Sequence, residues 1–392
     1  MSNFVIFSLS RWNEEFGCNI RDISIELAKN HKVLFIDVPL KRKDRLFDTK
    51  SNRVKEVEKR AADAANIIQV SENLWHYIDF SVLESVNSIQ YSWLFDLINR
   101  INNKRFAGVI KKAVEQLNFE PYILLNDNDI YNGLYLRKHL TPSLYIYYLR
   151  DRLSAMKYWQ KHVTRLEPDL IRQVDMVVAN SVYLAESAAT LNQNSFYIGQ
   201  GCAIDHFANR PRDIYIEGFT DRIKKPIVGY IGAINSERLD IQLILNVASK
   251  LKEFSFVFVG KEDNAFEKCD LHKMDNVFFT GNQDFSILPK YLYSFDVAIN
   301  PQLLNDVTIG NYPRKIDEFL AAGKPVVATE TPTMRPFSEY VYLAKNADEY
   351  IKMIRQAILE DSQEQQKSRK DFASTHNWKN SVEVLLKHVN LE

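Results

Sequence analysis

The stretch that most constrains the fold of this chain is the segment YPRKIDEFLAAGKPVVAT at positions 312–329. Pro313 suits the first turn of a helix, where the N–H that proline lacks is not needed. Gly323 is placed to end that helix. Lys324-Pro325 then leads into the apolar run PVVAT, which is typical of a buried strand. The segment therefore predicts a helix joined to a strand of a parallel sheet.

The front of this predicted helix carries two charges that share one face. Lys315 and Glu318 are three residues apart, which places them on the same side. A lysine beside the exposed N–H groups of a helix start suits phosphate oxygens, and a carboxylate one turn further can accept hydrogen bonds from ribose hydroxyls. In isolation, such a pair is far more often a solvated ion pair on a surface helix. The surrounding sequence decides between the two interpretations.

Length and composition favour a globular chain of two domains. The chain has 392 residues, 46% of them apolar and 12% aromatic, which is enough for two substantial cores. Its 50 basic residues balance its 50 acidic ones, so we expect no nucleic-acid partner. The chain holds no run of eighteen apolar residues, and MSNFVIFSLSRW at its start is strand-like rather than a signal peptide. We therefore expect a cytoplasmic protein.

Neither the cysteines nor the histidines are spaced like metal ligands. Cys18, Cys202 and Cys269 lie far apart without a C-x-x-C motif, which favours neither a disulfide framework nor a zinc site. Among the eight histidines, His162 and His206 are expected to be structural.

Short apolar runs alternate with helix-period segments almost throughout, which predicts an α/β fold with parallel sheets. The polar, aperiodic stretch 207–225 separates two such series. We therefore expect a first domain over 1–206, a linker over 207–225 and a second domain over 226–376, each a doubly wound sheet, with their crevices face to face. In the first half, strands are expected at 4–8, 33–38, 67–70, 122–126, 144–148, 176–179 and 196–198, with helices at 20–29, 90–117, 161–173 and 182–191. In the second, strands are expected at 227–231, 256–259, 277–280, 297–300 and 326–328.

Five landmarks in order give the second half a family resemblance: IVGYIGAI at 227–234, FSFVFVG at 254–260, NVFFTG at 276–281, LPKYLYSFDVAINP at 288–301, and the opening segment. Together they resemble the donor-binding domain of bacterial group 1 glycosyltransferases of the GT-B architecture, which has two Rossmann-like domains. The resemblance implies a nucleotide-diphosphate sugar as donor, UDP- or GDP-linked, and a glycan or lipid-linked acceptor in envelope or exopolysaccharide synthesis. It also implies that the helix over 377–392 crosses back onto the first domain.

The same resemblance suggests a donor site. The equivalents of Lys315 and Glu318 hold the phosphates and the ribose in such enzymes. Gly232 closes a strand and lets the backbone approach a ligand. A loop at 301–311 is suited to fold over a diphosphate, which adds Thr308 and Tyr312. The site departs from the family pattern at two places, where the second glutamate of retaining members is replaced by Gly310 and a basic pair is reduced to Arg238.

Asp151 is the candidate catalytic base. In PSLYIYYLRDRLSAM it follows a predicted strand, so it should lie at the carboxyl end of a parallel sheet. The segment resembles the S-D-x-L-S stretch of inverting exopolysaccharide glycosyltransferases such as the xanthan glucuronosyltransferase, where the aspartate is the base. An alternative is that Asp151 pairs with Arg150 or Arg152, or caps a helix. The second half has no Asp-x-Asp at a strand end, so we expect no metal or other cofactor.

Two features concern the acceptor side. Arg11, Trp12 and Asn13 follow the first strand and suit an anionic or sugar-containing acceptor, although an ordinary loop with a packed indole fits equally well. Residues 41–60 hold nine basic and four acidic side chains, and the helix from Gln90 mixes aromatic with basic residues. These stretches suit peripheral contact with anionic lipid headgroups at the inner face of the cell membrane. A solvated loop and an ordinary amphipathic core helix is the slightly favoured alternative.

Two other functions fit the same architecture. A nucleotide-sugar 2-epimerase-like isomerase would need several acids and histidines near the crevice, and the sequence lacks that cluster beside its landmarks. A non-catalytic partner subunit would be consistent with Gly310, whereas Lys315, Glu318 and Asp151 argue against it.

Overall fold

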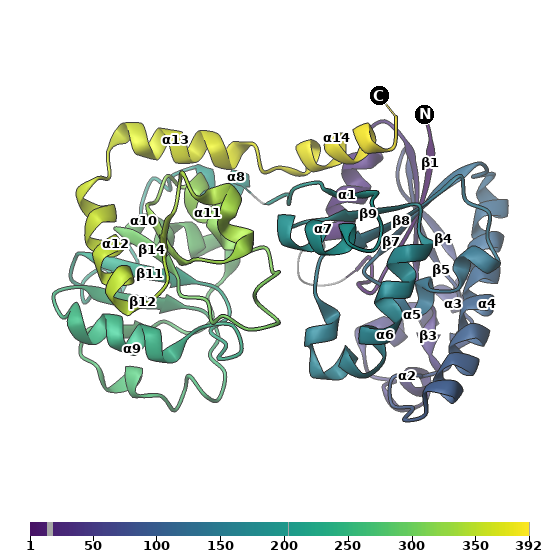
Figure 1. Ribbon diagram of the computed structural model, residues 1–392, viewed down its shortest axis with the longest axis horizontal. Coiled ribbons are helices and arrows are strands. Elements are labelled where there is room, and N and C mark those ends of the chain that lie inside the picture. Colours follow the sequence, from purple (N-terminus) through teal and green to yellow (C-terminus); the bar gives the residue numbers. More distant parts are fainter. Residues whose placement is uncertain (14–18, 203, 392) are drawn as a thin grey trace. The chain divides into compact units, whose positions relative to one another are not determined.

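The computed structural model describes residues 1–13, 19–202 and 204–391, which form two compact units (Figure 1). The first unit comprises Met1–Gly199 and Ser381–Glu392, and the second comprises Gln200–Asn380. The division therefore falls before residue 206, and the expected linker 207–225 lies within the second unit. The reason is packing, because Phe207 and Phe219 are buried in the second unit's core.

The first unit is built on an eight-stranded sheet in the order β10-β9-β8-β7-β1-β2-β5-β4, parallel except where β4 pairs with β5. Its inner strands are buried on both faces, which explains their continuous apolar sequences. The strands are β1 (Asn3–Ser8), β2 (Lys32–Asp37), β4 (Ile67–Ser71), β5 (Leu74–Ile78), β7 (Tyr122–Asp127), β8 (Leu144–Leu149), β9 (Met176–Ala179) and β10 (Ser195–Tyr197), with β3 (Leu40–Lys41) and β6 (Val82–Leu83) paired separately.

Helices flank this sheet, and the last helix of the chain returns to it. They are α1 (Asn19–Leu27), α2 (Arg42–Phe47), α3 (Asn52–Ala62), α4 (Ser92–Leu117), α5 (Ile130–Gly133), α6 (Lys157–Gln173) and α7 (Val182–Ala189). The final helix, α14 (Trp378–His388), starts in the second unit and ends in the first. There the ring of His388 stacks on Phe196, with centroids 3.8 Å apart.

The second unit has a fully parallel sheet in the order β13-β12-β11-β14-β15-β16. Its strands are β11 (Ile227–Ile231), β12 (Ser255–Val259), β13 (Val277–Phe279), β14 (Val297–Asn300), β15 (Val326–Thr329) and β16 (Tyr342–Ala344). Its helices are α8 (Ile204–Ala208), α9 (Ile241–Lys250), α10 (Leu288–Ser294), α11 (Arg314–Ala321), α12 (Ala347–Leu359) and α13 (Gln363–Ser374). The strand expected at 227–231 is confirmed residue for residue, as are those at 176–179 and 297–300.

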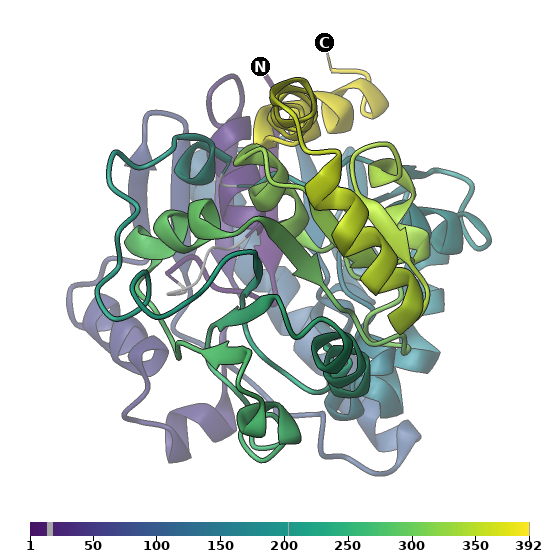
Figure 2. The same ribbon diagram turned by 90° about the vertical axis from the view of Figure 1, so that its left-hand side faces the viewer.

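Both sheets have the doubly wound strand order, with the chain reversing direction across the sheet between β1 and β7 and between β11 and β14. In the second unit, alternate strand residues enter two cores, one under α10 and α11 and the other under α9 and α12. Figure 2, with this unit nearest the viewer, shows the sheet between these helices. In such sheets, ligands bind beyond the carboxyl ends of the strands at the reversal point, so each unit offers one place to search.

Candidate functional site

Two glycines, Gly232 after β11 and Gly260 after β12, let two backbone segments approach each other very closely. Gly232 has φ +139° and Gly260 has φ +151°, conformations that side-chain-bearing residues rarely adopt. A Cβ atom on Gly260 would lie 1.9 Å from the carbonyl oxygen of Gly232. A Cβ on Gly232 would lie 3.1 Å from Nζ of Lys315. The expected glycine turn and the expected lysine therefore meet at the reversal point of the second sheet.

The ammonium group of Lys315 lies above this turn on an aromatic support. It donates a hydrogen bond to the hydroxyl of Tyr230 and lies 4.1 Å from the centre of the same ring. The Tyr230 hydroxyl in turn donates to the carbonyl oxygen of Ala233 at 3.0 Å. Within the described ranges, no carboxylate forms an ion pair with Lys315. Its positive charge is held in place but not neutralised, which suits a phosphate ligand.

Glu318 lies one turn further along α11 and is partly buried. Burial raises the pKa of its carboxyl group to about 7, although the charges of Arg314 and Lys315 act in the opposite direction. Over the part of the chain that the structure describes, its carboxyl oxygens have no hydrogen-bond partner. The solvated Lys–Glu pair that the sequence also allowed is therefore not formed, and both side chains are available to a ligand.

The remaining predicted donor residues are placed differently. Thr308 is 1% exposed, and its hydroxyl donates to the carbonyl oxygen of Leu303, so it stabilises its own loop rather than facing a ligand. Tyr312 is also buried. Arg238 is exposed, and its carbonyl oxygen accepts a hydrogen bond from Leu303 N–H at 2.8 Å, which places it beside the same loop. The structure thus brings Gly232, Lys315 and Glu318 together. Thr308 and Tyr312 are buried and do not face a ligand, and Arg238 lies at the exposed edge of this site.

Both histidines expected to be structural make packing contacts. His162 stacks on Phe95 with centroids 4.0 Å apart, and its Nε2 lies 2.9 Å from the carbonyl oxygen of Ile89. His206 stacks on Phe285 at 4.0 Å, and its Nε2 lies 2.8 Å from the Phe285 carbonyl oxygen. Among the described residues, no three His, Cys, Asp or Glu side chains are grouped so that they could hold a metal ion.

In the first unit, Asp151 follows the carboxyl end of β8, as expected. Its side chain is 32% exposed, and the nearest cationic atom, Nη1 of Arg150, is 4.0 Å away. Arg150 is engaged elsewhere, because its Nε lies 2.8 Å from Asp127 and its Nη2 donates to Ser10 at 3.0 Å. The short helix that begins at Leu153 has Arg152 as its N-cap and no side-chain cap. The carboxylate of Asp151 is therefore neither a helix cap nor tightly paired with Arg150.

Asp127 is a site residue that sequence reasoning missed. It ends β7 beside β1, is fully buried, and accepts a hydrogen bond of 2.5 Å from the hydroxyl of Ser8. Burial raises the pKa of Asp127 above its usual value, against the effects of Arg150 and Ser8. The available signal was the polar run Asn-Asp-Asn-Asp at 126–129, directly after an apolar strand. Asp127 holds the Arg150 side chain in place, and Arg150 directly precedes Asp151 at the carboxyl end of β8.

The predicted acceptor residues are mostly engaged within the first unit. Arg11 lies 2.9 Å from the buried carboxylate of Asp37. Burial alone would raise the pKa of Asp37, but the hydrogen bond from His76 and the charge of Arg11 hold it below its usual value. Trp12 is 8% exposed and packs against His76, so it is the packed indole that the sequence also allowed. Asn13 is exposed and donates to a glutamate of α3.

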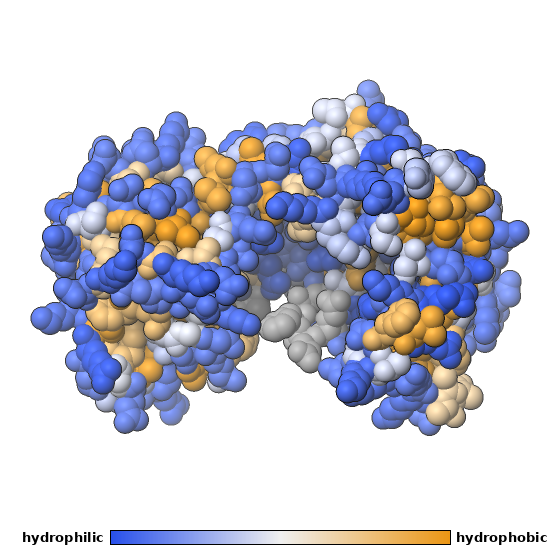
Figure 3. Space-filling view, turned by 90° about the horizontal axis from the view of Figure 1, so that it is seen from below, coloured by the Kyte–Doolittle hydropathy of each residue, from blue (hydrophilic) through white to orange (hydrophobic). Residues whose placement is uncertain are grey.

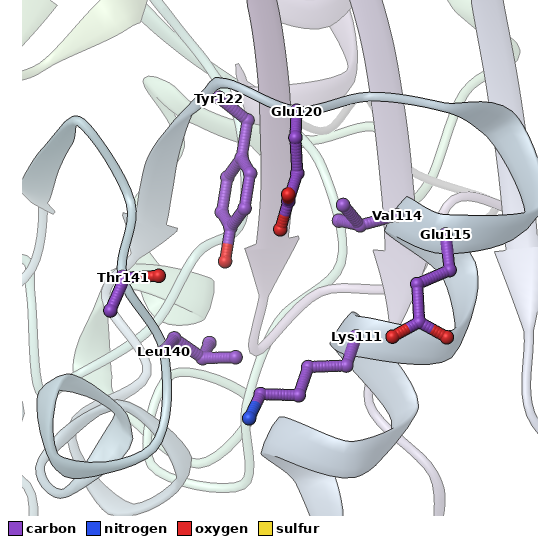
Figure 4. A pocket seen from close by; sticks show the side chains of 7 residues that line it. All are labelled: Lys111, Val114, Glu115, Glu120, Tyr122, Leu140 and Thr141. Carbon is purple, nitrogen blue, oxygen red and sulfur yellow. The ribbon is translucent and has the colours of Figure 1, made fainter.

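A surface hollow of about 240 Å³ lies at the opposite end of the first sheet. It is lined by Lys111, Val114, Glu115, Glu120, Tyr122, Leu140 and Thr141. Figure 4 shows Lys111 of α4 and Tyr122, the first residue of β7, pointing into it. Because this is the amino end of β7, the hollow is not at the reversal point where ligands of such sheets bind.

Comparison with known proteins agrees with this geometry. Residues 225–360 match the family described as glycosyl transferases group 1. The second unit carries a group 1 glycosyltransferase domain. A curated relative, the putative teichuronic acid biosynthesis glycosyltransferase TuaH of Bacillus subtilis (strain 168), is 29% identical over 175 residues. That match covers 42% of this chain and 43% of TuaH, so it spans less than half of the relative's length.

Solved structures extend the likeness to the whole fold. A glycosyltransferase from Rickettsia africae ESF-5 has a TM-score of 0.68 at 16% identity, with both chains covered completely. The Anabaena protein HepE, solved in complex with UDP, has a TM-score of 0.66 at 16% identity, again over both whole chains. The expected GT-B fold with two Rossmann-like domains is therefore confirmed. The match of residues 225–360 to the group 1 family supports the expected resemblance of the second unit to glycosyltransferases.

Proposed function

We propose that this protein transfers a glycosyl group from a UDP- or GDP-linked sugar to a glycan or lipid-linked acceptor in the synthesis of an envelope polysaccharide. The observation that carries the proposal is the un-neutralised ammonium of Lys315 above the Gly232 turn, with the unpartnered carboxyl of Glu318 beside it. The name of TuaH, which refers to teichuronic acid biosynthesis, supports an envelope polysaccharide, and the UDP bound in the HepE structure supports a nucleotide donor.

In this proposal, Lys315 binds the diphosphate and stabilises its charge as the nucleotide leaves. Arg238 and the N-terminal amides of α11 supplement it. Glu318 accepts hydrogen bonds from the ribose hydroxyls. Because burial removes water from the Glu318 carboxylate and raises its pKa to about 7, hydrogen bonds from a ribose are worth more to it than to an exposed glutamate.

Asp151 is proposed as the general base of an inverting transfer. It removes the proton from the acceptor hydroxyl while that oxygen attacks the anomeric carbon and the nucleoside diphosphate departs. The exposure of its carboxylate supports this role, since a base must reach the acceptor. The Asp127–Arg150 pair supports it further, because a guanidinium bound to Asp127 is not free to clamp Asp151.

Calorimetric titration with UDP and with GDP tests the donor site directly. We expect one nucleotide to bind, and to bind equally well in buffers containing EDTA or Mg²⁺, since protein cations replace a metal on the diphosphate. A non-catalytic scaffold would bind neither nucleotide, and that result would remove the proposed function. Binding that is abolished by EDTA and restored by Mg²⁺ would instead show that the metal-free proposal is wrong.

We also propose that the first unit contacts an anionic membrane from the cytoplasmic side, through an exposed apolar face of α4. Trp93, Leu97 and Ile101 lie four residues apart, and their exposed fractions are 69%, 52% and 43%. The opposite face of α4 packs into the core through Phe95 and Phe106. This helix is therefore apolar on two sides, which a simple core helix does not need.

A second exposed apolar pair lies on α2, which is linked to α4 through ion pairs. Phe47 and Leu46 end α2 and are 80% and 63% exposed. Glu84 ties the two helices together, since it pairs with Arg42 of α2 at 2.8 Å and with Arg105 of α4 at 3.0 Å. Figure 3 shows apolar patches among hydrophilic atoms on the first unit, at the right.

Basic side chains surround these apolar residues, which favours anionic headgroups over a protein partner. Exposed examples are Lys43, Arg45, Arg100 and Lys104. No helix among the described residues is both long and apolar enough to cross a bilayer.

Vesicle binding tests this surface. We expect the protein to sediment with vesicles containing phosphatidylglycerol and to bind pure phosphatidylcholine far less. Replacing Trp93 and Leu97 with serine removes two insertable side chains, each worth about 1.5–3 kcal/mol, so binding should fall by at least about tenfold. Leu359→Ser is the matched control, because that leucine is 86% exposed but lies in the second unit. Equal binding by both variants would contradict the proposal.

A further inference from the structure

Asp317 lies on α11 between Lys315 and Glu318, next to Glu318, and its side chain is directed into the interior of the second unit. It is fully buried, and both of its carboxyl oxygens have partners. Oδ1 lies 2.5 Å from Nδ1 of His376, and Oδ2 accepts a hydrogen bond from the Cys202 thiol at 3.1 Å. Lys315 and Glu318 lie on the same short helix, so any shift of this anchor is transmitted to both.

The two partners of Asp317 belong to the two segments by which the chain passes between the units. The chain enters the second unit after Gly199 and leaves it after Asn380. These segments are joined, because the N–H of Cys202 donates to the carbonyl oxygen of His376 at 3.1 Å. They are also closely packed, since a Cβ atom on Gly201 would lie 2.2 Å from the ring of Trp378.

The surroundings hold this cluster in one arrangement. The His376 ring packs edge-on against Phe372 and Phe337, with centroids 4.5 Å and 5.7 Å away. Burial, followed by the nearby charge of Asp317, raises the pKa of the Cys202 thiol well above its usual value, so the thiol stays protonated and acts as a donor. A buried carboxylate with two fixed donors is costly to disrupt.

We propose that Asp317 is a positioning residue that fixes the donor helix to both interdomain chain segments, so that nucleotide binding at Lys315 and Glu318 also stabilises residues 199–202 and 376–381. This inference rests on the proposed function for its nucleotide. Asp317 does not touch the ligand but acts through the helix that carries Lys315 and Glu318.

Hydrogen–deuterium exchange of the full chain, with and without saturating UDP or GDP, tests the coupling. In the wild type, we expect the nucleotide to slow exchange at 230–234 and 314–318, and also at 199–202 and 376–381. In Asp317→Asn, the nucleotide should no longer slow exchange at 199–202 and 376–381, but it should still slow exchange at 230–234. Without nucleotide, these segments should exchange about tenfold faster in the variant than in the wild type.

Asp296→Asn is the matched control, because Asp296 binds Lys225 and the Ile227 N–H at the amino end of the sheet and makes no contact with either interdomain segment.

If Asp317→Asn does not fold, Cys202→Ala removes one of the two contacts and should give the same pattern in weaker form. Unchanged protection of the interdomain segments in the variant would overturn the inference. If neither nucleotide slows exchange at 314–318 in the wild type, the proposed function fails. The anchoring role is tested separately, because it would be overturned if residues 199–202 and 376–381 exchanged equally fast in the wild type and in Asp317→Asn without nucleotide.

Discussion

Asp151→Asn is expected to lower turnover by about 10²- to 10⁴-fold while nucleotide affinity changes by no more than a few-fold. The amide is nearly isosteric with the carboxylate but cannot take a proton from the acceptor hydroxyl. The site tolerates the exchange structurally, because the Asp151 side chain is 32% exposed and its nearest cation is 4.0 Å away. The measurement is the steady-state rate of nucleotide release in the presence of acceptor, with affinity measured by calorimetry.

Asp169→Asn is the control for this experiment. Asp169 is a more exposed aspartate of the same unit, on α6, where it pairs with Arg172, and its replacement should leave turnover unchanged. Near-normal turnover of Asp151→Asn would remove Asp151 as the base. A product with the anomeric configuration of the donor would mean retention, and Asp151 would then need another role.

Sequence reasoning located the donor helix well because the signals there are local. Proline before the helix, glycine after it and an apolar strand beyond it all lie within the segment 312–329. Gly323 has the positive φ of +75° that a helix-ending glycine adopts. Buried parallel strands were equally visible, because burial on both faces leaves an uninterrupted apolar run. The strand Leu74–Ile78 was missed, since its Trp-His-Tyr centre lacks that pattern.

Local sequence patterns could not predict contacts between residues that are far apart along the chain. Asp317 is 59 residues from His376 and 115 from Cys202, and Asp127 is 119 residues from Ser8. No local pattern shows that Asp127 and Asp317 are fully buried whereas Asp151 is partly exposed. The same limit explains why Thr308 was predicted to bind the donor. A threonine hydroxyl suits a phosphate contact, but this one donates to the carbonyl oxygen of Leu303 in its own loop. Residue type and strand position can suggest a site, but burial decides which side chains face it.

Lys315→Ala is expected to weaken binding of the preferred nucleotide by about ten- to a hundredfold, because a charge-assisted phosphate contact is worth roughly 1.5–3 kcal/mol. The loss should depend on the phosphates, so affinity for the corresponding nucleoside, which has none, should stay nearly constant. Lys345→Ala, at a lysine 67% exposed in the same unit, controls for general charge and should bind as the wild type does. Tyr230→Phe keeps the aromatic support but removes the hydroxyl to which the ammonium donates, so its effect should be smaller than that of Lys315→Ala. Unchanged nucleotide affinity in a folded Lys315→Ala protein would show that the ammonium above the Gly232 turn is not the phosphate ligand.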